Sequence, residues 1–361
     1  MTDSDRRIEH PDDPTMDELA DRLSDLATSL DSDDSWPARQ LELCAQHGVF
    51  EWFITPEFGG QGWSNVDVVR GYLRLSAACL TTTFVITQRA GACRRIAASS
   101  NAWLRETCLA PLIQGHRFAT VGVSHLTTSR RHLNKPVLTA TAQGAHYVLD
   151  GYSPWVTGAG FADWLVIGAS LADGRQLLVT VPTDLPGVEV DPPLPLVGLS
   201  ASQTGPVRFA GAEVPAQWVL AGPATEIMKQ GSGATSGGLQ TSTLAAGLAD
   251  SAISFLECES ERRPNLATVC RALRAEWNQL RVDLLAAAGG PSDHTIQDLR
   301  TRANRLVLRA TRAALMAAKG TGYIRGHATG RWCREALFFL VWSCPQPVLD
   351  AHLCELASLG F

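Results

Sequence analysis

Trp155 and Thr157 are the residues of this sequence whose types and spacing point most directly to chemistry. They lie in a β-prone run that begins at Tyr152 and is stopped by Gly158–Gly160. The dipeptide before this run, Asp150-Gly151, tolerates positive φ and predicts a β-hairpin turn. Most hairpins of this kind are ordinary pieces of a β-sheet. An indole beside a hydroxyl, however, can bind a planar ring: the indole packs against the ring, and the hydroxyl hydrogen-bonds a nitrogen at its edge.

The composition favours a globular protein and argues against several functional classes. The chain has 361 residues, of which 45% are hydrophobic, so it can bury a large core in two or three domains. The net charge of −5 argues against nucleic-acid binding. No run of about 18 apolar residues predicts a membrane span, and the polar residues 1–14 do not resemble a signal peptide. Nine cysteines without a CxxC pair are typical of reduced thiols in the cytoplasm, and no metal site is expected.

Hydrophobic periodicity divides the chain into three parts. Residues 1–14 are expected to be disordered, and apolar residues at helical spacing predict helices from there to residue 117. Residues 118–223 are rich in Val, Thr, Gly and Pro in short alternating runs, which predicts a β-domain. Long helical patterns return in residues 224–361 and predict a four-helix bundle. The predicted fold class is therefore α+β: a helical domain, a middle β-domain and a C-terminal helical bundle.

Several segments resemble, in the same order, those of the acyl-CoA dehydrogenase family. Trp155-Val156-Thr157 and the glycines after it resemble the family's Trp-Ile-Thr-Asn-Gly hairpin, whose Trp and Thr lie against the flavin. Pro56–Gly62 is similar to a Pro-Glu-x-x-Gly-Gly-x-Gly loop between the family's N-terminal helices. Gly187–Val190 and Val207–Pro215 resemble two segments of its β-domain. The resemblance covers essentially the whole chain and implies the acyl-CoA dehydrogenase fold.

The resemblance implies FAD as the cofactor and suggests residues that hold its ring. Trp155 and Thr157 match the hairpin that lies against the ring. Val123 and Ser124 match a Val-Thr pair whose hydrogen bonds hold the pyrimidine edge of the flavin, and Ser124 keeps the hydroxyl. His125 follows directly and is a candidate acid or base, although a lone histidine is more often structural.

The adenine end of FAD is matched in the last part of the chain. Lys319–Tyr323 is similar to a Gly-Gly-x-Gly-Tyr loop that reaches the cofactor from another subunit. Its members Gly320, Thr321 and Gly322 are therefore candidate cofactor residues, since glycines allow close backbone approach to a pyrophosphate. Arg262, or its neighbour Arg263, is the nearest match to the family arginine that grips the diphosphate.

The resemblance also locates two positions for the catalytic base, and neither holds a carboxylate. Most members carry a glutamate after an Arg-Asp-Ala segment; here Arg334-Glu335-Ala336 leads to Ser343 at that place. Other members carry it on the first helix of the C-terminal domain, close to Gln240 here. Removing the α-proton of an acyl thioester needs a carboxylate, which neither a serine nor a glutamine replaces. Glu335 is more than two helical turns from Ser343, too far to substitute locally. The catalytic residue is left unassigned.

Three functions remain open at this point. The first is an FAD-dependent oxidoreductase that acts on an acyl thioester, bound to CoA or to a carrier protein, without the usual glutamate. The second is a flavin-dependent monooxygenase of the same superfamily, using FAD or FMN, which needs no α-proton base. The third is a degenerate homologue with a non-redox or flavin-free role. The family further implies a homodimer or homotetramer and an acyl carrier or electron-transfer protein as partner, with no nucleic acid or membrane.

Overall fold

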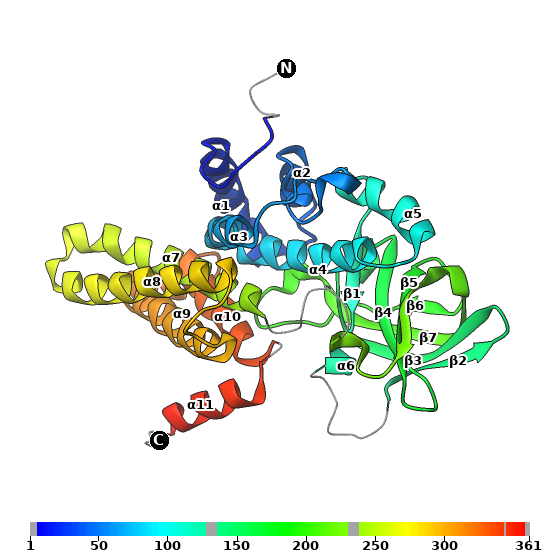
Figure 1. Cartoon of the computed structure of the whole chain (residues 1–361). Helices are drawn as coiled ribbons and strands as arrows, with labels where there is room; N and C mark the ends of the chain where they lie inside the picture. Colours follow the sequence, from blue (N-terminus) through cyan, green and yellow to red (C-terminus); the bar gives the residue numbers. More distant parts are fainter. Residues whose placement is uncertain (1–5, 128–135, 230–237, 343, 358–361) are drawn as a thin grey trace.

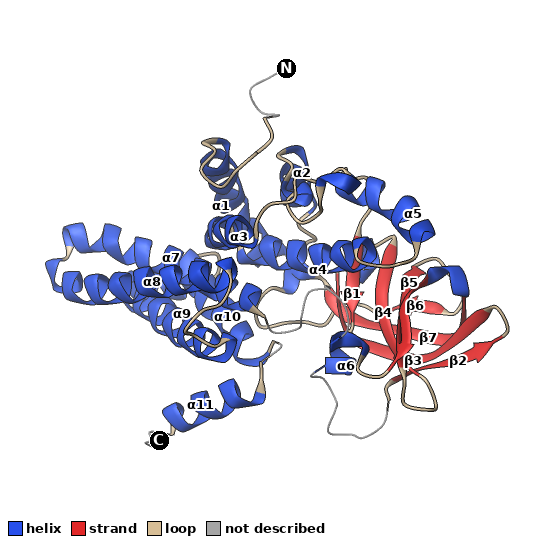
Figure 2. Ribbon diagram, in the orientation of Figure 1, coloured by secondary structure: helices blue, strands red, loops and turns tan. Residues whose placement is uncertain are grey.

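The computed structural model describes residues 6–127, 136–229, 238–342 and 344–357, and three parts follow one another along the chain. N-terminal helices come first, a β-sheet follows, and a helical bundle ends the chain (Figure 1). The strands lie together at one end of the molecule, with α5 (Ala102–Ile113) and α6 (Ser124–Thr127) beside them, and α4 (Leu80–Ala97) reaches from the bundle to the sheet (Figure 2). The predicted α+β fold class is confirmed.

The N-terminal part contains α1 (Thr15–Asp33), α2 (Ala38–Gln46), α3 (Asn65–Ala78), α4 and α5 (Ala102–Ile113). Two helix starts have side-chain caps: Ser64 accepts from the backbone N–H of Asp67, and Asn101 accepts from that of Leu104. The apolar residues of α1 to α3 and of the first half of α4 join those of the C-terminal bundle in one hydrophobic core, whereas those of α5 and the end of α4 pack with residues of the β-sheet. The N-terminal helices therefore connect the two other parts: α1 to α3 are packed on the bundle, and α5 is packed on the sheet.

The expectation of disorder through residue 14 is wrong for residues 6–14. The Ile8 side chain is fully buried, and its backbone N–H donates to the carbonyl of His47 (3.1 Å). The carbonyl of Arg6 accepts from the ring of His47 (3.1 Å). The single apolar residue of this polar segment therefore anchors it to the turn after α2.

The middle part is one eight-stranded sheet. Its main path runs in the order β6-β7-β3-β2-β4-β5-β8, and β1 pairs with β4 in parallel. The strands are β1 (Ala119–Gly122), β2 (Leu138–Gln143), β3 (His146–Thr157), β4 (Trp164–Ser170), β5 (Gln176–Pro182), β6 (Val188–Val190), β7 (Thr204–Pro215) and β8 (Val219–Ala224). The predicted domain boundaries at 117 and 223 thus lie between α5 and β1 and inside β8.

The hairpin turn predicted at Asp150-Gly151 is wrong. Strand β3 runs straight through these residues, and the turn lies instead at residues 144–145, between β2 and β3. The pairing of β3 with β7 shifts register after Leu149, which makes a β-bulge. Gly151 has a φ of +120°, and a Cβ there would lie 2.1 Å from the carbonyl oxygen of Val137. The extra residue of the bulge is Gly211 on β7, whereas Gly151 is required by its positive φ and by close approach of the neighbouring backbone.

The C-terminal part is built on α7 (Leu239–Arg262), α8 (Ala267–Gly289), α9 (Ile296–Ala318) and α10 (Ala328–Val341), followed by α11 (Gln346–Leu356). Gly247 lets α7 approach α3 closely, since a Cβ there would lie 2.7 Å from the carbonyl oxygen of Leu73. Across the same contact, Ser76 donates to the carbonyl of Leu244 (2.7 Å). Among the described residues, no helix has the length and apolar character needed to cross a membrane, and no cluster of side chains suits a metal ion.

Candidate functional site

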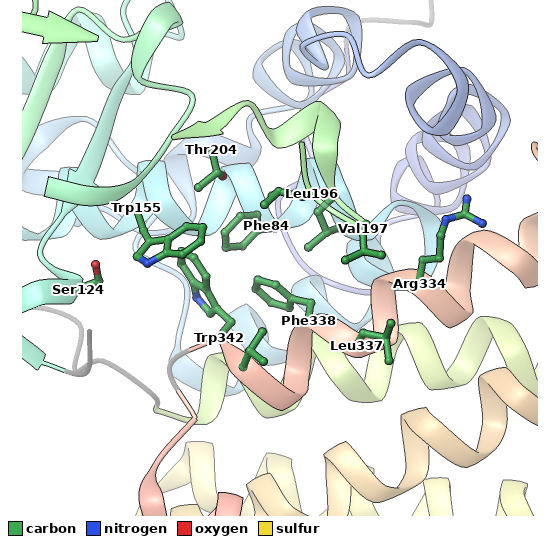
Figure 3. Close-up of a pocket in the computed structure, with 13 residues that line it drawn as sticks. Phe84, Ser124, Trp155, Leu196, Val197, Thr204, Arg334, Leu337, Phe338 and Trp342 are labelled. Atoms are coloured by element: carbon green, nitrogen blue, oxygen red, sulfur yellow. The ribbon is translucent and has the colours of Figure 1, made fainter. Parts of the chain in front are cut away.

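A largely apolar cavity of about 340 Å³ lies where the β-sheet meets α4 and α10 (Figure 3). Three kinds of element line it: the β-domain, the segment that precedes β7, and two helices. Arg334 is the one charged residue among the described residues of this lining. The lining residues are Phe84, Ser124, Trp155, Leu196, Val197, Gly198, Leu199, Thr204, Arg334, Leu337, Phe338, Val341 and Trp342.

Helix α10 forms the aromatic wall on the bundle side. Phe338 and Trp342 lie one helical turn apart and stack on each other, with ring centroids 5.3 Å apart and planes at 22°. Phe84 of α4 meets both rings edge-on at 4.9 Å. These contacts fix the aromatic side chains against one another, so the wall is preorganised for a flat apolar occupant.

The β-domain side contributes an indole and hydroxyl groups. Trp155 on β3 lines the same cavity as the α10 wall (Figure 3). Thr157 does not line it: its hydroxyl is buried and lies 2.9 Å from that of Thr204, which does. Ser202 lies 2.8 Å from the same Thr204 hydroxyl. Thr204, which the sequence did not single out, therefore carries the hydroxyl at the cavity, and Thr157 lies behind it.

Ser124, Val123 and His125 lie at the end of β1. Ser124 begins the short helix α6 (Ser124–Thr127) and lines the cavity, whereas Val123 is packed in the hydrophobic core beside it. The ring of His125 is buried, and its Nε2–H donates to the carbonyl of Gly168 (2.6 Å). Burial lowers the pKa of His125 and keeps the ring neutral, as expected for a residue that anchors α6 on β4.

The residues matched to the adenine end lie together but away from the Trp155 cavity. Gly320, Thr321 and Gly322 belong to the 3₁₀ turn Lys319–Tyr323 that follows α9. This turn is next to the end of α7, because Arg263 donates to the carbonyl of Ala317 (2.7 Å), and the exposed Arg262 is the last residue of α7. None of these residues lines the Trp155 cavity in the described part of one chain.

Of the two sequence positions predicted for the base, Ser343 and Gln240, only Gln240 lies among the described residues. Ser343 lies outside the described residues; its neighbour Trp342 lines the Trp155 cavity. Gln240, in the first turn of α7, lines a second cavity of about 630 Å³, together with Pro345. The structure does not bring Gln240 to Trp155.

A third cavity, of about 330 Å³, adjoins the first and is polar. The two share the wall formed by Leu196–Leu199 and Arg334. Glu335 of α10 lines the polar cavity and is buried, accepting from the Thr81 hydroxyl (3.5 Å) with Arg331 at 3.8 Å. Burial raises the pKa of Glu335 to about 7, although Arg331 opposes the shift.

Sequence reasoning set Glu335 aside and missed the rest of this polar cavity. Arg334 donates to both oxygens of Asp31 (2.5 and 2.6 Å), which ties α10 to α1. In the sequence, the Arg334-Glu335-Ala336 segment only indicates where position 343 lies. In the structure, Glu335 supplies a buried carboxyl and Arg334 lines both cavities. Glu335 does not line the Trp155 cavity itself.

Comparison with known proteins gives the same family from two directions. Residues 13–116 match the family model described as acyl-CoA dehydrogenase, N-terminal domain. The chain is 22% identical over 333 residues to the probable acyl-CoA dehydrogenase YngJ of Bacillus subtilis, covering 86% of this chain and 87% of that protein. The shared N-terminal domain and the near full-length relative both indicate the acyl-CoA dehydrogenase family.

Solved structures agree on the fold. Butyryl-CoA dehydrogenase from Megasphaera elsdenii has a TM-score of 0.81 at 18% identity, over 98% of both chains. KijD3, solved in complex with FMN and a dTDP-linked amino-keto sugar, has a TM-score of 0.74 at 19% identity, over 96% of this chain and 93% of that one. The chain is therefore similar to acyl-CoA dehydrogenases in its N-terminal domain, along most of its length and in its fold.

Proposed function

We propose that the protein is an FAD-dependent oxidoreductase that acts on an acyl thioester, carried by CoA or by a carrier protein. One observation carries this proposal: the cavity that joins Trp155, Ser124 and Thr204 of the β-domain to the aromatic wall of α10. A flavin would supply a hydride acceptor at this place. The chain's own residues would bind its ring, exclude water and orient the substrate beside it.

The residues present fit the ring of a flavin. The cavity is bordered by Trp155 on one side and by Phe338 and Trp342 on the other, which suits a flat apolar body. Ser124 and Thr204 place hydroxyls at the β-domain side, where ring nitrogen and oxygen atoms need hydrogen bonds. Its volume is within the range of small-molecule sites. We propose that the backbone of Val123 supports the edge of the ring beside Ser124.

A second copy of the chain would complete the cofactor site. Arg262, Gly320, Thr321 and Gly322 do not line the Trp155 cavity of their own chain, so they would serve the adenine end of FAD in a homodimer or homotetramer. An acyl carrier or electron-transfer protein remains the proposed partner, and a cytoplasmic location the proposed compartment. The nine cysteines, all within described positions, are free thiols.

A monooxygenase of the same superfamily is the second candidate. The described lining of the Trp155 cavity contains no Asp or Glu that could remove an α-proton, and oxygen insertion needs none. KijD3, which shares the fold, is named with FMN rather than an acyl thioester. A protein that is colourless after purification and binds neither FAD nor FMN would leave only the third function, a degenerate homologue without redox chemistry.

Replacing Trp155 by Ala is expected to weaken flavin binding roughly tenfold to hundredfold, because the variant loses stacking area and a wall of the site. The measurement is the flavin absorbance of the purified protein, followed by titration of the apoprotein with FAD. Trp155→Phe keeps an aromatic wall and should retain most of the affinity. Trp103→Ala, on α5, removes an indole elsewhere and should change nothing. Unchanged flavin content in Trp155→Ala would disprove the placement.

The protein is expected to be an oligomer whose interface includes the end of α9. Met316, Tyr323 and Ile324 are 79%, 90% and 64% exposed there, which is costly for large apolar side chains in water. Tyr323→Glu should shift the protein toward monomer, measured by light scattering at micromolar concentration. Ala172→Glu, in the turn after β4, is the control and should have no such effect. A wild-type monomer would contradict this prediction.

A further inference from the structure

The cavity of about 630 Å³ beside α7 is not used by the proposed chemistry, yet it gathers groups that favour negative charge. It lies between α3, α4 and the first turn of α7, with the start of α9 and Pro345 closing it. Arg94 is its one charged residue among the described lining, and no Asp or Glu is part of that lining. A cavity with a single unopposed cation attracts anions.

Arg94 and Tyr72 are held side by side by Phe53. The guanidinium carbon of Arg94 lies 5.2 Å from the centre of the Phe53 ring, and the Tyr72 ring stacks on the same ring at 5.3 Å. No Asp or Glu lies with Arg94 in the described lining of this cavity. Its charge is therefore oriented by an aromatic contact that leaves the guanidinium N–H groups available.

Tyr72 provides an independent indication of a ligand. The residue is 2% exposed, and its hydroxyl has no hydrogen-bond partner among the described residues. Gln240 lies near enough to influence this hydroxyl but outside hydrogen-bonding geometry. Burial raises the pKa of Tyr72, so the hydroxyl keeps its proton and is a donor. A buried donor without a partner is costly, and a ligand acceptor would remove that cost.

The N-terminus of α7 supports the same reading. Gly238, Leu239 and Gln240 line the cavity at the start of this 24-residue helix. Its N-cap is a glycine without a side-chain cap, and its first turn carries no acidic residue. The first backbone N–H groups and the positive end of the helix dipole thus lie at the cavity that Arg94 also lines.

We propose that this cavity binds an anionic group, a carboxylate or a phosphate, carried by the substrate. The Arg94 guanidinium supplies the charge, the Tyr72 hydroxyl and the Gln240 amide donate hydrogen bonds, and the start of α7 adds its dipole. Arg94 lies ten residues after Phe84 on α4, roughly 15 Å along the helix. A substrate that reaches both cavities is therefore elongated, with its charged group well separated from the part beside Trp155. Only this link to the substrate rests on the proposed function; anion binding does not.

The test uses inorganic phosphate and acetate as probes, on the protein as purified and at constant ionic strength. A saturable rise in Tm is expected with at least one of them, by mass action, and which of the two binds more tightly identifies the anion. Arg94→Met should weaken that binding roughly tenfold or more, as expected for a hydrogen bond to a charged group. Tyr72→Phe should weaken it less. Arg312→Met, an exposed arginine of α9, is the control and should bind like the wild type.

Gln240→Glu covers the case in which Arg94→Met fails to fold. Its carboxylate repels an anion in the same cavity, so the affinity should fall while circular dichroism stays unchanged. No saturable effect in the wild type, or equal effects in Arg94→Met and Arg312→Met, would overturn the assignment. Flavin absorbance is recorded on the same samples. Anion binding without flavin would reject the proposed function alone, and flavin without anion binding would reject this site alone.

Discussion

Straight-chain saturated acyl-CoA thioesters are expected to reduce the flavin of this protein about 10²–10⁴-fold more slowly than an enzyme with a positioned base would allow. The described lining of the Trp155 cavity contains no carboxyl group. By sequence, the two positions where the family carries its glutamate hold Ser343 and Gln240. The measurement is the loss of flavin absorbance after anaerobic mixing with a series of acyl-CoAs.

Two variants of Ser343 test whether the missing carboxylate limits the rate of flavin reduction. Ser343→Glu should raise the rate of flavin reduction, whereas Ser343→Gln has nearly the same shape without basicity and should not. Fast reduction of the wild type would show that a base has been misplaced. Glu335→Gln then identifies whether the buried carboxyl in the adjoining cavity is that base, since the rate would fall only in that variant.

The free energy of unfolding is expected to fall by about 3 kcal/mol between pH 4.5 and pH 7 through Glu335 alone. Burial raises the pKa of this carboxyl from an ordinary value of 4.5 to about 7. Between these values the folded protein holds a proton that the unfolded chain releases. Stability from this proton is therefore present below pH 4.5 and is lost as the pH rises through 7.

Denaturant unfolding of the wild type and Glu335→Gln at several pH values measures this term. As the pH rises, the free energy of unfolding of Glu335→Gln should increase relative to that of the wild type, because glutamine does not ionise. Glu276→Gln, which also removes a carboxylate paired with an arginine (Arg309) but at the surface, should leave the pH dependence nearly unchanged. Parallel curves for the wild type and Glu335→Gln would show that the carboxyl is not perturbed.

Local periodicity was enough to predict the helices and their order. Leu19 and Leu23 recur at helical spacing, and both are fully buried on α1 (Thr15–Asp33). It was not enough at Asp150-Gly151, because a glycine with positive φ is found both in turns and where a neighbouring backbone comes close. The pairing of β3 with β7, a contact distant in sequence, shows that the strand continues through these residues.

The cavity residues likewise divide into those that short sequence segments predict and those that only tertiary packing brings together. Trp155 and Ser124 could be named from short segments, and the structure places both in one cavity. Phe84, Phe338 and Trp342 could not, since aromatic residues at helical spacing are typical of any hydrophobic core. Only the packing of α4 against α10 makes them a wall. Thr204 was missed because its role depends on Thr157, on a strand brought beside it by the sheet.

The three hydroxyls of Thr157, Thr204 and Ser202 form a row with a limited supply of protons. Each hydroxyl has one hydrogen to donate and two lone pairs. When Thr157 and Ser202 both donate to Thr204, the oxygen of Thr204 is filled and its own hydrogen points elsewhere. A cavity occupant with a lone pair at that point satisfies all three groups, whereas an N–H there takes one lone pair of Thr204, so that one of the two hydrogen bonds of the row changes direction. The row therefore accommodates an acceptor beside Thr204 without change, and a donor by turning the hydrogen of one neighbouring hydroxyl.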